Sequence, residues 1–246
     1  MGSESKVIVI TGAGSGIGRV LTRGLLAAGH RVVLAGRREE ALRETADKDP
    51  NALCVPTDVR DPDSVRRLFA AVDEQFGRVD VLINNAGVFG RPASVDEVTD
   101  EDWDAILAAN VSGSVYCARE AIKRMKEQGD GGRVINNSSI SARVPRPRSI
   151  GYTTTKHAIT GLTRSINLDG RAHQITATEL NIGNAATAMT SGMIEAPQPD
   201  GTRRAEPTFD PEHLVAMIRD VIALPNTVSV PELMVMAAGM PFAGRG

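Results

Sequence analysis

Aromatic residues are scarce in this chain of 246 residues, where Phe, Tyr and Trp together make up 3%. The core must therefore be built from Val, Ile, Leu, Ala and Met, and a hydrophobic fraction of 41% is ordinary for a protein with a full core. The length allows one large α/β domain or two small ones. Because no linker, internal repeat or low-complexity tract marks a boundary, we expect a single domain spanning residues 1–246.

Cysteine is almost absent, and the two that are present, Cys54 and Cys117, lie in unrelated segments. Their spacing indicates neither a disulfide framework nor a metal site, and they are typical of small buried hydrophobes in a reducing compartment. The four histidines do not share a metal-ligand spacing with carboxylates. We therefore expect no metal and a cytoplasmic location.

Long hydrophobic runs and a strong excess of one charge are also missing. No run approaches the length of a membrane span, and residues 1–6 hold no apolar stretch typical of a signal peptide. The net charge is −2 and the basic residues are dispersed, which excludes the electrostatic pattern of a nucleic-acid-binding protein. We expect a soluble protein with a small-molecule substrate and no nucleic-acid or membrane partner.

Short apolar runs alternate with longer amphipathic stretches along the chain. The apolar runs predict strands at 7–10, 31–35, 52–55, 79–83, 133–136, 175–180 and within 230–236. The amphipathic stretches predict helices at 16–28, 39–47, 62–76, 100–126, 150–170 and 211–223. Strands separated by helices pair in parallel through right-handed crossovers. We therefore predict an α/β fold, a Rossmann-like doubly wound parallel sheet of about seven strands with helices on both faces.

One long segment, residues 184–210, has no regular pattern and is rich in Ala, Pro, Thr and Gly. A loop of this length in a compact domain is usually a lid or a binding loop. We favour a lid over the substrate, and the alternative is a flexible surface excursion.

A glycine-rich turn, Thr11-Gly-Ala-Gly-Ser-Gly-Ile-Gly18, joins the first predicted strand to the first predicted helix. Glycines there allow a sharp turn and a close backbone approach to a pyrophosphate, which binds at the helix N-terminus. The spacing is Gly12-x-x-x-Gly16-x-Gly18, with Ile17 where the usual motif has its third glycine. The place of the turn between a buried strand and a helix favours dinucleotide binding over an ordinary tight loop.

The turn resembles the opening signature of the short-chain dehydrogenases/reductases, and four further motifs carry the resemblance along nearly the whole chain. In chain order they are Asn84-Asn-Ala-Gly87, Asn110-Val-Ser-Gly113, Ser138-Ser139 and Tyr152-Thr-Thr-Thr-Lys156. Each is common alone, but five in this order and spacing are highly specific. The resemblance implies an NAD(P)(H)-dependent oxidoreductase that interconverts a ketone and a secondary alcohol by hydride transfer.

Tyr152 and Lys156 are four residues apart and share one face of a predicted helix. A tyrosine can donate the proton that a developing alkoxide needs, and a nearby ammonium group lowers its pKa. Spacing alone would indicate a surface pair, but the other motifs favour a catalytic one that also contacts the cofactor. The resemblance implies that Ser139 orients the substrate, with Ser138 as the fallback. It also implies that Asn110 interrupts its helix and holds a water beside Lys156.

The end of the second predicted strand indicates which nicotinamide the chain prefers. An acidic residue there would bind the ribose diol of NAD, but the position is Gly36, followed by Arg37 and Arg38. A missing carboxylate removes repulsion of a 2′-phosphate and a guanidinium attracts it, so NADP(H) is favoured and NAD(H) stays open. The alternative is that both arginines form a solvated helix start. Ser15, at a turn position that is often basic in the family, adds no support for NADP(H).

Further cofactor contacts follow from the resemblance alone. It places Asp58 and Val59 beside the adenine, although Asp58 also suits a cap for the turn before Pro62. The other implied positions surround the phosphates, the ribose and the nicotinamide: Gly12, Ser15, Gly16, Ile17, Gly18, Asn85, Ala86, Gly87, Gly183, Ala185 and Thr187. Ile182 stands where the family usually has a proline, so we expect the loop after it to be softer or to have a different backbone path.

Substrate contacts are expected from residues 91–95, 141–151 and the 184–210 lid. The segment 141–151 holds three arginines and two prolines, which form either a basic rim for an anionic substrate or solvated surface. Met189, Met193 and Ile194 suggest an apolar wall, and the substrate is expected to be a moderately apolar ketone or secondary alcohol.

Two other functions remain open at this point. One is a non-catalytic dinucleotide-binding regulator, and the other is an imine reductase or isomerase on the same scaffold. The resemblance further implies a homotetramer, or a homodimer, built through the predicted helices 100–126 and 150–170 and the C-terminal strand.

Overall fold

The computed structural model describes residues 5–188, 190, 196–197 and 202–242. Its strands are β1 (Val7–Thr11), β2 (Arg31–Gly36), β3 (Ala52–Pro56), β4 (Val81–Asn84), β5 (Gly132–Asn137), β6 (Ile175–Gly183), β7 (Ala196–Pro197), β8 (Arg203–Arg204) and β9 (Glu232–Met236). Its α-helices are α1 (Gly16–Ala27), α2 (Glu39–Ala46), α3 (Pro62–Phe76), α4 (Asp100–Leu107), α5 (Gly113–Gln128), α6 (Ile150–Asp169) and α7 (His213–Ala223). A π-helical turn, η1 (Ala108–Ser112), and two 3₁₀ turns, η2 (Ile140–Ala142) and η3 (Arg171–His173), complete the elements.

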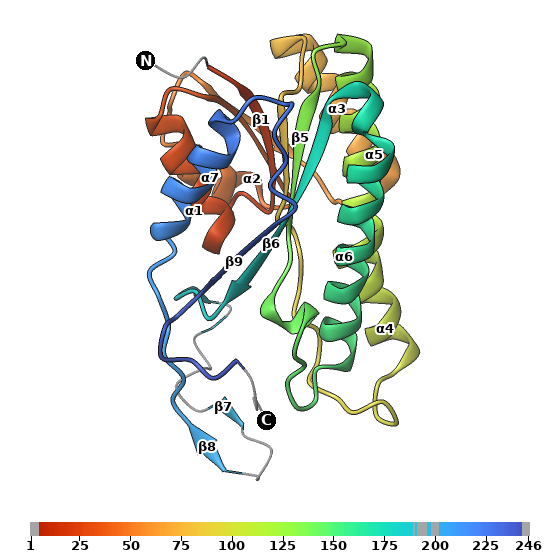
Figure 1. Cartoon of the computed structure of the whole chain (residues 1–246), viewed down its shortest axis with the longest axis vertical. Helices are drawn as coiled ribbons and strands as arrows, with labels where there is room; N and C mark the ends of the chain where they lie inside the picture. The colour runs from red at the N-terminus through yellow and green to blue at the C-terminus, as the bar shows by residue number, and fades with distance from the viewer. Residues whose placement is uncertain (1–4, 189, 191–195, 198–201, 243–246) are drawn as a thin grey trace.

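Seven strands pair in parallel in the order β3-β2-β1-β4-β5-β6-β9. The chain winds outward from β1 in one direction and then returns to wind outward in the other, which is the doubly wound arrangement. Figure 1 shows α1, α2 and α7 against one face of the sheet and α3, α5 and α6 against the other. The predicted Rossmann-like α/β fold is confirmed.

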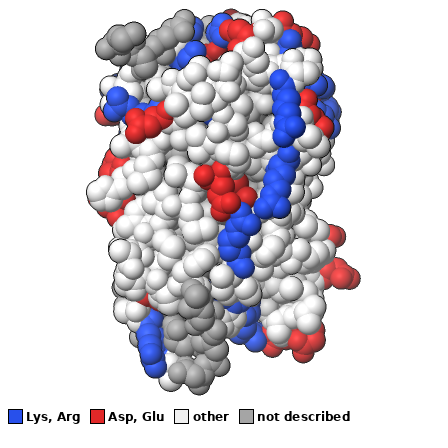
Figure 2. Space-filling view, in the orientation of Figure 1, with Lys and Arg blue, Asp and Glu red and all other residues white. Residues whose placement is uncertain are grey.

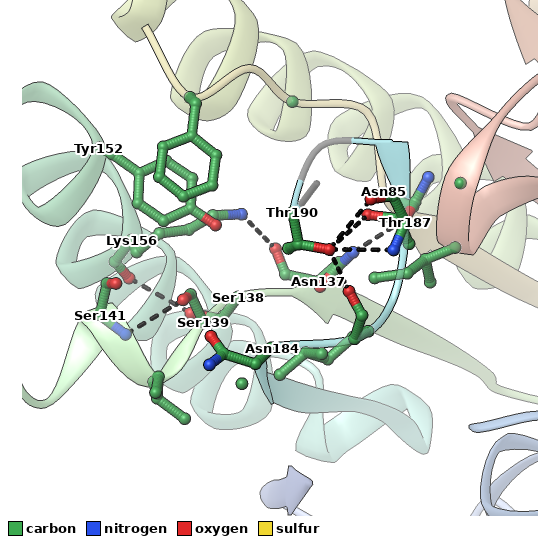
Figure 3. Close-up of a pocket in the computed structure, with 18 of the residues that line it drawn as sticks. Asn85, Asn137, Ser138, Ser139, Ser141, Tyr152, Lys156, Asn184, Thr187 and Thr190 are labelled. Atoms are coloured by element: carbon green, nitrogen blue, oxygen red, sulfur yellow. Dashed lines mark hydrogen bonds between the residues drawn. The ribbon is translucent and has the colours of Figure 1, made fainter. Parts of the chain in front are cut away.

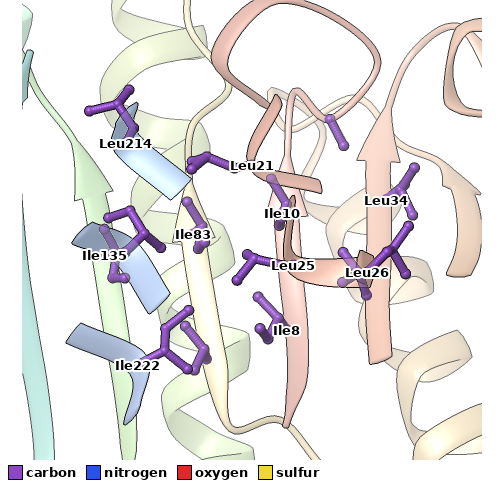
Figure 4. Close-up of a cluster of buried hydrophobic side chains, with 14 of the residues drawn as sticks. Ile8, Ile10, Leu21, Leu25, Leu26, Leu34, Ile83, Ile135, Leu214 and Ile222 are labelled. Carbon is purple, nitrogen blue, oxygen red and sulfur yellow. The ribbon is translucent and has the colours of Figure 1, made fainter. Parts of the chain in front are cut away.

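The sheet is covered on both faces, so its inner strands are apolar along their whole length. In β1 the side chains of Ile8 and Ile10 enter the core beneath α1 and α7, and those of Val7 and Val9 enter the core beneath α3 and α5. Figure 4 shows the first of these cores, where Ile8 and Ile10 meet Leu21 and Leu25 of α1. The aliphatic core expected from the scarcity of aromatics is therefore present on both sides.

Two segments differ from the sequence prediction. The stretch predicted as one helix at 100–126 is two helices joined by the π turn η1, which inserts a residue into the hydrogen-bond ladder around Asn110, where the resemblance implied an interruption. The segment 184–210, predicted to be irregular, contains the short antiparallel pair β7 and β8. Two-residue strands are too short to show an alternating pattern in the sequence.

The described helices include none that is long and apolar enough to cross a bilayer. Within the same described residues, no group of three His, Cys, Asp or Glu side chains is arranged to hold a metal ion. Cys117 is buried and Cys54 half-buried, and both are free thiols. On the face drawn in Figure 2, acidic and basic side chains lie beside one another on a surface that is mostly uncharged.

Helix α1 starts in close contact with the glycine turn. A Cβ atom on Gly18 would lie 2.2 Å from the carbonyl oxygen of Gly12 and 2.6 Å from Nδ2 of Asn85. Contacts that short are forbidden, so the glycine allows the helix, the turn and the segment after β4 to lie together.

Gly18→Ala is therefore expected to lower the free energy of unfolding by about 1–3 kcal/mol, because the added methyl group forces the turn and the helix apart. Urea unfolding measures the change. Gly161→Ala in α6 is the control, because a Cβ there meets nothing within 4 Å, and the better helix former should stabilise the protein slightly. A Gly18→Ala variant as stable as the unmodified protein would contradict this packing account.

Candidate active site

Polar side chains at the carboxyl ends of the parallel strands are linked across the sheet (Figure 3). The Thr11 hydroxyl accepts hydrogen bonds from the backbone N–H groups of Asn85 and Ala86, both at 3.0 Å. The Asn85 side chain donates to the Thr11 carbonyl at 2.9 Å and accepts from the Asn137 side chain at 2.8 Å. Lys156 Nζ donates to the Asn137 carbonyl at 2.8 Å. These bonds connect the glycine turn to Lys156.

A cavity of about 220 Å³ lies over this edge of the sheet. Most of the predicted site residues line it, namely Gly12, Ser15, Gly16, Ile17, Asn85, Ala86, Gly87, Ser139, Tyr152, Lys156, Gly183, Ala185 and Thr187. They come from the glycine turn and from the segments after β4, β5 and β6, together with α6. Gly18 and Asn110 do not line it.

The backbone of the glycine turn fits the pyrophosphate of a dinucleotide. Gly12 and Gly16 adopt φ angles of 67° and 51°, in the left-handed region that glycine tolerates. At Gly16 an added Cβ would touch only Thr187, at 3.8 Å, so the backbone is open to the cavity. The Ser15 side chain caps none of the first N–H groups of α1. An uncapped helix N-terminus beside an open glycine turn is a ready anion site.

A second hollow adjoins the cavity and shares Gly12, Ser15, Ala86 and Gly87 with it. All the remaining predicted cofactor residues except Gly18 line this hollow, namely Gly36, Arg37, Arg38, Asp58 and Val59. Together the cavity and the hollow follow the glycine turn from the end of β2 to Tyr152, as an extended dinucleotide requires.

Arg60, which the sequence analysis did not single out, also lines the second hollow. Its Nη2 lies 2.6 Å from Oδ2 of Asp58, and its Nε bonds both carboxylate oxygens. The hydrogen bonds from Arg60 hold the pKa of Asp58 below its usual value. Asp58 also accepts from the backbone N–H of Arg60 at 3.0 Å, so it caps a turn as well. Because Asp58 and Arg60 balance each other, the net positive charge of the residues that line the hollow comes from Arg37 and Arg38.

The Tyr152 ring contacts two side chains beside the cavity (Figure 3). Phe89 stacks on it with ring centroids 4.2 Å apart and planes inclined by 6°. Lys156 Nζ lies 5.5 Å from the Tyr152 ring centroid, within the range of a cation–π contact. The spacing of four residues therefore places both groups on one face of α6, as predicted.

Burial changes the proton affinity of both groups. It raises the pKa of the Tyr152 phenol, and a hydrogen bond with Ser139 and the charge of Arg146 oppose the rise. It lowers the pKa of Lys156 to about 8. The sequence analysis expected Lys156 to lower the tyrosine pKa. In the structure the pKa of Tyr152 is raised on balance, and the two groups that oppose the rise are Ser139 and Arg146.

Both serines after β5 line the cavity. Ser139 Oγ accepts from the backbone N–H of Ser141 at 3.1 Å, which caps η2 and fixes the hydroxyl in the wall. Ser138 Oγ is directed to the backbone carbonyl of Lys156 at 3.5 Å. Of the two, Ser139 is the one that interacts with the Tyr152 phenol.

Asn110 lies in the π turn η1 and is buried behind the cavity. Its Oδ1 accepts from the backbone N–H of Val88 at 2.8 Å. Its Nδ2 donates to the Val88 carbonyl at 2.9 Å and to Thr155 Oγ1 at 3.1 Å. The side chain thus joins the segment after β4 to the residue before Lys156, and the predicted helix interruption occurs at Asn110.

The three arginines of segment 141–151 do not form a common rim. Arg143 pairs with Glu232 at 2.6 Å, and Arg148 pairs with Glu97 at 2.6 Å. Arg146 alone among them lines the cavity. The segment 91–95, expected near the substrate, contributes no residue to the cavity lining in the described part of the chain.

The loop after β6 has a defined path without the usual proline. Asn184 adopts a φ of 48° in the left-handed region. The Asn184 carbonyl accepts from Phe209 N–H at 3.1 Å, and Ala186 N–H donates to the Phe209 carbonyl at 2.8 Å. Thr187 N–H donates to Thr190 Oγ1 at 2.9 Å (Figure 3). The loop is therefore held by hydrogen bonds. The predicted wall residues Met189, Met193 and Ile194 lie outside the described residues.

Sequence reasoning did not single out several residues that line these sites, among them Arg60, Phe89 and Asn137, and it included Thr190 only as part of segment 184–210. Phe89 and Asn137 adjoin the motifs Asn84–Gly87 and Ser138–Ser139, so proximity in the chain was a usable signal. Arg60 follows Asp58 by two residues and repeats the basic character of Arg37. Nothing in the sequence separates Thr190 from the other threonines of its segment.

The model of the short-chain dehydrogenase family matches residues 6–198. A 3beta-hydroxysteroid dehydrogenase of Mediterraneibacter gnavus is 34% identical over 194 residues, which cover 76% of this chain and 68% of the relative. An uncharacterised oxidoreductase of Staphylococcus aureus is 32% identical over 232 residues, which cover 94% of this chain and 96% of the relative.

Two solved structures show the same fold with a nicotinamide bound. An actinorhodin polyketide ketoreductase with NADPH has a TM-score of 0.83 at 28% identity, covering 94% of this chain and 96% of that one. A 3-ketoacyl-(acyl-carrier-protein) reductase of Brucella melitensis with NADH has a TM-score of 0.84 at 27% identity, covering 94% of this chain and 97% of that one. The chain belongs to the short-chain dehydrogenase family and is an NAD(P)-dependent oxidoreductase that interconverts carbonyl and alcohol groups.

Proposed function

We propose that this protein is a single-domain reductase or dehydrogenase in which Tyr152 exchanges the proton of a ketone/secondary alcohol pair. The observation that carries the proposal is the meeting of Ser139, Tyr152 and Lys156 in one cavity that continues along the glycine turn. A bound nicotinamide supplies or accepts the hydride. The protein's own groups bind the carbonyl oxygen, hold the proton and exclude water.

Each of the three groups has a distinct role. Ser139, fixed by its bond from Ser141, donates to the carbonyl oxygen and stabilises the charge that grows there. The Tyr152 phenol donates its proton to the same oxygen during reduction and takes it back during oxidation. Lys156 binds the cofactor ribose and returns a proton to Tyr152. A lysine pKa of about 8 suits it to both giving and accepting a proton near neutral pH.

Asn110 acts as a positioning residue. Its bonds to Val88 and Thr155 fix the segment after β4 against the turn of α6 that carries Lys156. A water beside Asn110 is proposed, from the family resemblance, to connect Lys156 with solvent.

The cofactor is proposed to be NADP(H). The hollow at the end of β2 has Gly36 in place of an acidic residue and is lined by Arg37, Arg38 and Arg60. Its only carboxylate among the described lining residues, that of Asp58, is paired with Arg60. A 2′-phosphate would meet positive charge there without a free carboxylate to repel it.

The segment 184–210 is proposed to cover the substrate, because its first residues line the cavity and Asn184 and Ala186 are bonded to Phe209. A homotetramer or homodimer formed through α4, α5, α6 and β9 is proposed from family resemblance, and light scattering measures it. An imine substrate remains the second candidate, since the same hydride and proton positions serve a C=N bond.

Tyr152→Phe is expected to reduce turnover of a ketone panel by about 100- to 10,000-fold, because the ring stays and only the proton donor is lost. Tyr116→Phe is the matched control, since Tyr116 is the other tyrosine of the chain and lies on α5 outside the cavity. Fluorescence titration with the reduced nicotinamide should show cofactor binding kept in both variants. Unchanged turnover in Tyr152→Phe would exclude the proposed proton donor.

Arg37→Ala is expected to weaken NADP(H) binding by about tenfold or more while changing NAD(H) binding little, because a charge-assisted bond to the 2′-phosphate is lost. The measurement is a titration with each cofactor in turn. Arg43→Ala on α2, whose partner is the exposed Glu39, is the control. Equal losses for the two cofactors would remove the phosphate-binding role from Arg37.

Lys156→Met is expected to raise the free energy of unfolding at pH 7 without cofactor. The lysine pKa falls from 10.5 to about 8 on burial, so the unfolded chain holds this proton more tightly than the folded protein does. The resulting penalty of about 3 kcal/mol is complete below pH 8 and fades as the pH rises towards 10.5.

Urea unfolding across this pH range measures the difference between the variant and the unmodified protein. That difference should shrink with rising pH. Lys126→Met, at an exposed position of α5, should show a small and constant difference. A constant difference for Lys156→Met as well would contradict the lowered lysine pKa.

A further inference from the structure

The cavity walls carry charge of one sign only. Among the described residues that line the cavity, Arg146 and Lys156 are charged, and neither Asp nor Glu is present. Lys156 donates to the Asn137 carbonyl and lies against Tyr152. Of these two charged groups, only Lys156 has a place in the proposed proton transfer itself, which leaves Arg146 to be explained.

Arg146 is held in place by two buried partners. Its Nη2 lies 2.6 Å from Oδ1 of Asn184 and 2.7 Å from Oε2 of Glu206. Asn184 Nδ2 donates to the same Glu206 oxygen at 2.8 Å. The exposed fractions of the Arg146 and Glu206 side chains are 13% and 5%. The three groups form a closed triangle, which fixes the guanidinium before any substrate arrives.

The backbone around Arg146 is also constrained. Pro145 and Pro147 flank it, and each proline ring fixes its own φ angle. Ser149 Oγ accepts from the Arg146 N–H at 3.3 Å and donates to its carbonyl at 2.7 Å. Arg148, two residues away, instead pairs with Glu97 at a half-exposed position. The local structure thus turns one arginine of this segment into the cavity.

The carboxylate of Glu206 explains how an arginine can be largely buried at this position. An unpaired charge away from water is costly, and the Glu206 carboxylate compensates it. Glu206 does not itself line the cavity. An approaching substrate therefore meets the guanidinium and not the carboxylate that orients it.

We propose that Arg146 binds a carboxylate of the substrate, so that the protein acts on oxo acids and the corresponding hydroxy acids. This inference rests on the proposed function and adds the substrate class to it. A planar guanidinium with a fixed orientation suits a carboxylate, and the buried setting strengthens the bond. The carboxylate would lie on the Asn184 side of the cavity while the carbonyl oxygen lies between Ser139 and Tyr152.

Arg146 has one competing role, because its charge also opposes the rise in the Tyr152 pKa. An arginine that served only the tyrosine would change kcat for every ketone alike. A carboxylate-binding arginine changes KM, and only for substrates that carry the carboxylate. Steady-state kinetics separate the two roles.

The test uses 3-oxobutanoate, 4-oxopentanoate and 5-oxohexanoate, each beside its methyl ester, so that charge changes while the carbon chain is kept. The unmodified protein is expected to prefer the acid over the ester for at least one chain length. Arg146→Met should reduce that ratio of kcat/KM values by about 10- to 100-fold, as expected for the loss of a charge-assisted hydrogen bond. Arg148→Met is the matched control and should leave the ratio unchanged.

Glu206→Gln is expected to change the KM for the oxo acid in the opposite direction to Arg146→Met. It keeps a side-chain oxygen for hydrogen bonding and removes the charge that competes with the substrate carboxylate. The KM for the preferred oxo acid should therefore fall several-fold. Nicotinamide titration of each variant shows that the fold and the cofactor site are retained.

Three results would overturn the proposal: no preference for any acid over its ester in the unmodified protein, an unchanged ratio in Arg146→Met, or an equal fall in kcat for acids and esters. The proposed function fails in a different way. In that case the unmodified protein reduces neither the acids, the esters nor an uncharged ketone panel, although it binds the nicotinamide.

Discussion

Asn85 joins the carboxyl ends of three parallel strands. Its backbone and side chain bond Thr11 at the end of β1, and its Oδ1 accepts from Asn137 at the end of β5. The Asn137 carbonyl in turn accepts from Lys156. A parallel sheet brings strand ends to one edge, but it does not fix their separation. These bonds do so, and they place the glycine turn and the proton-transfer pair at set positions in one cavity.

The site that results holds several desolvated charges in a small volume. Lys156 is buried beside the half-buried Tyr152, and the side chains of the Arg146–Glu206 pair are largely buried nearby. Burying a charge costs free energy, and here it also lowers the pKa of Lys156 to about 8, near neutral pH. Burying these charges destabilises the fold, and the packed sheet compensates for that loss of stability. The same burial makes electrostatic recognition of a substrate charge strong.

Most of the fold was predictable because its signals are local. The bounds of α3 follow from Pro62 at its first turn and Gly77 after its last residue, and the apolar strands are continuous in the sequence. The motif residues were also predictable, since each lies in a short pattern. The rest depends on contacts between distant segments. No sequence pattern predicts that Arg146 lines the cavity while Arg148 does not. The position of Arg146 depends on its bond to Glu206, which lies 60 residues further along the chain. The interruption at Asn110 was expected from the motif that contains it, but the π geometry of the turn was not.

The central claim is that the ionisation of Tyr152 controls turnover. The chain has two tyrosines, so a Tyr116→Phe variant leaves Tyr152 as the sole source of tyrosinate absorbance. That absorbance is titrated with saturating oxidised nicotinamide, and the pH dependence of kcat/KM for alcohol oxidation is measured on the same variant. If the ionisation of Tyr152 controls turnover, the two curves share one midpoint. A rate that rises at a pH where the Tyr152 absorbance does not change would contradict it.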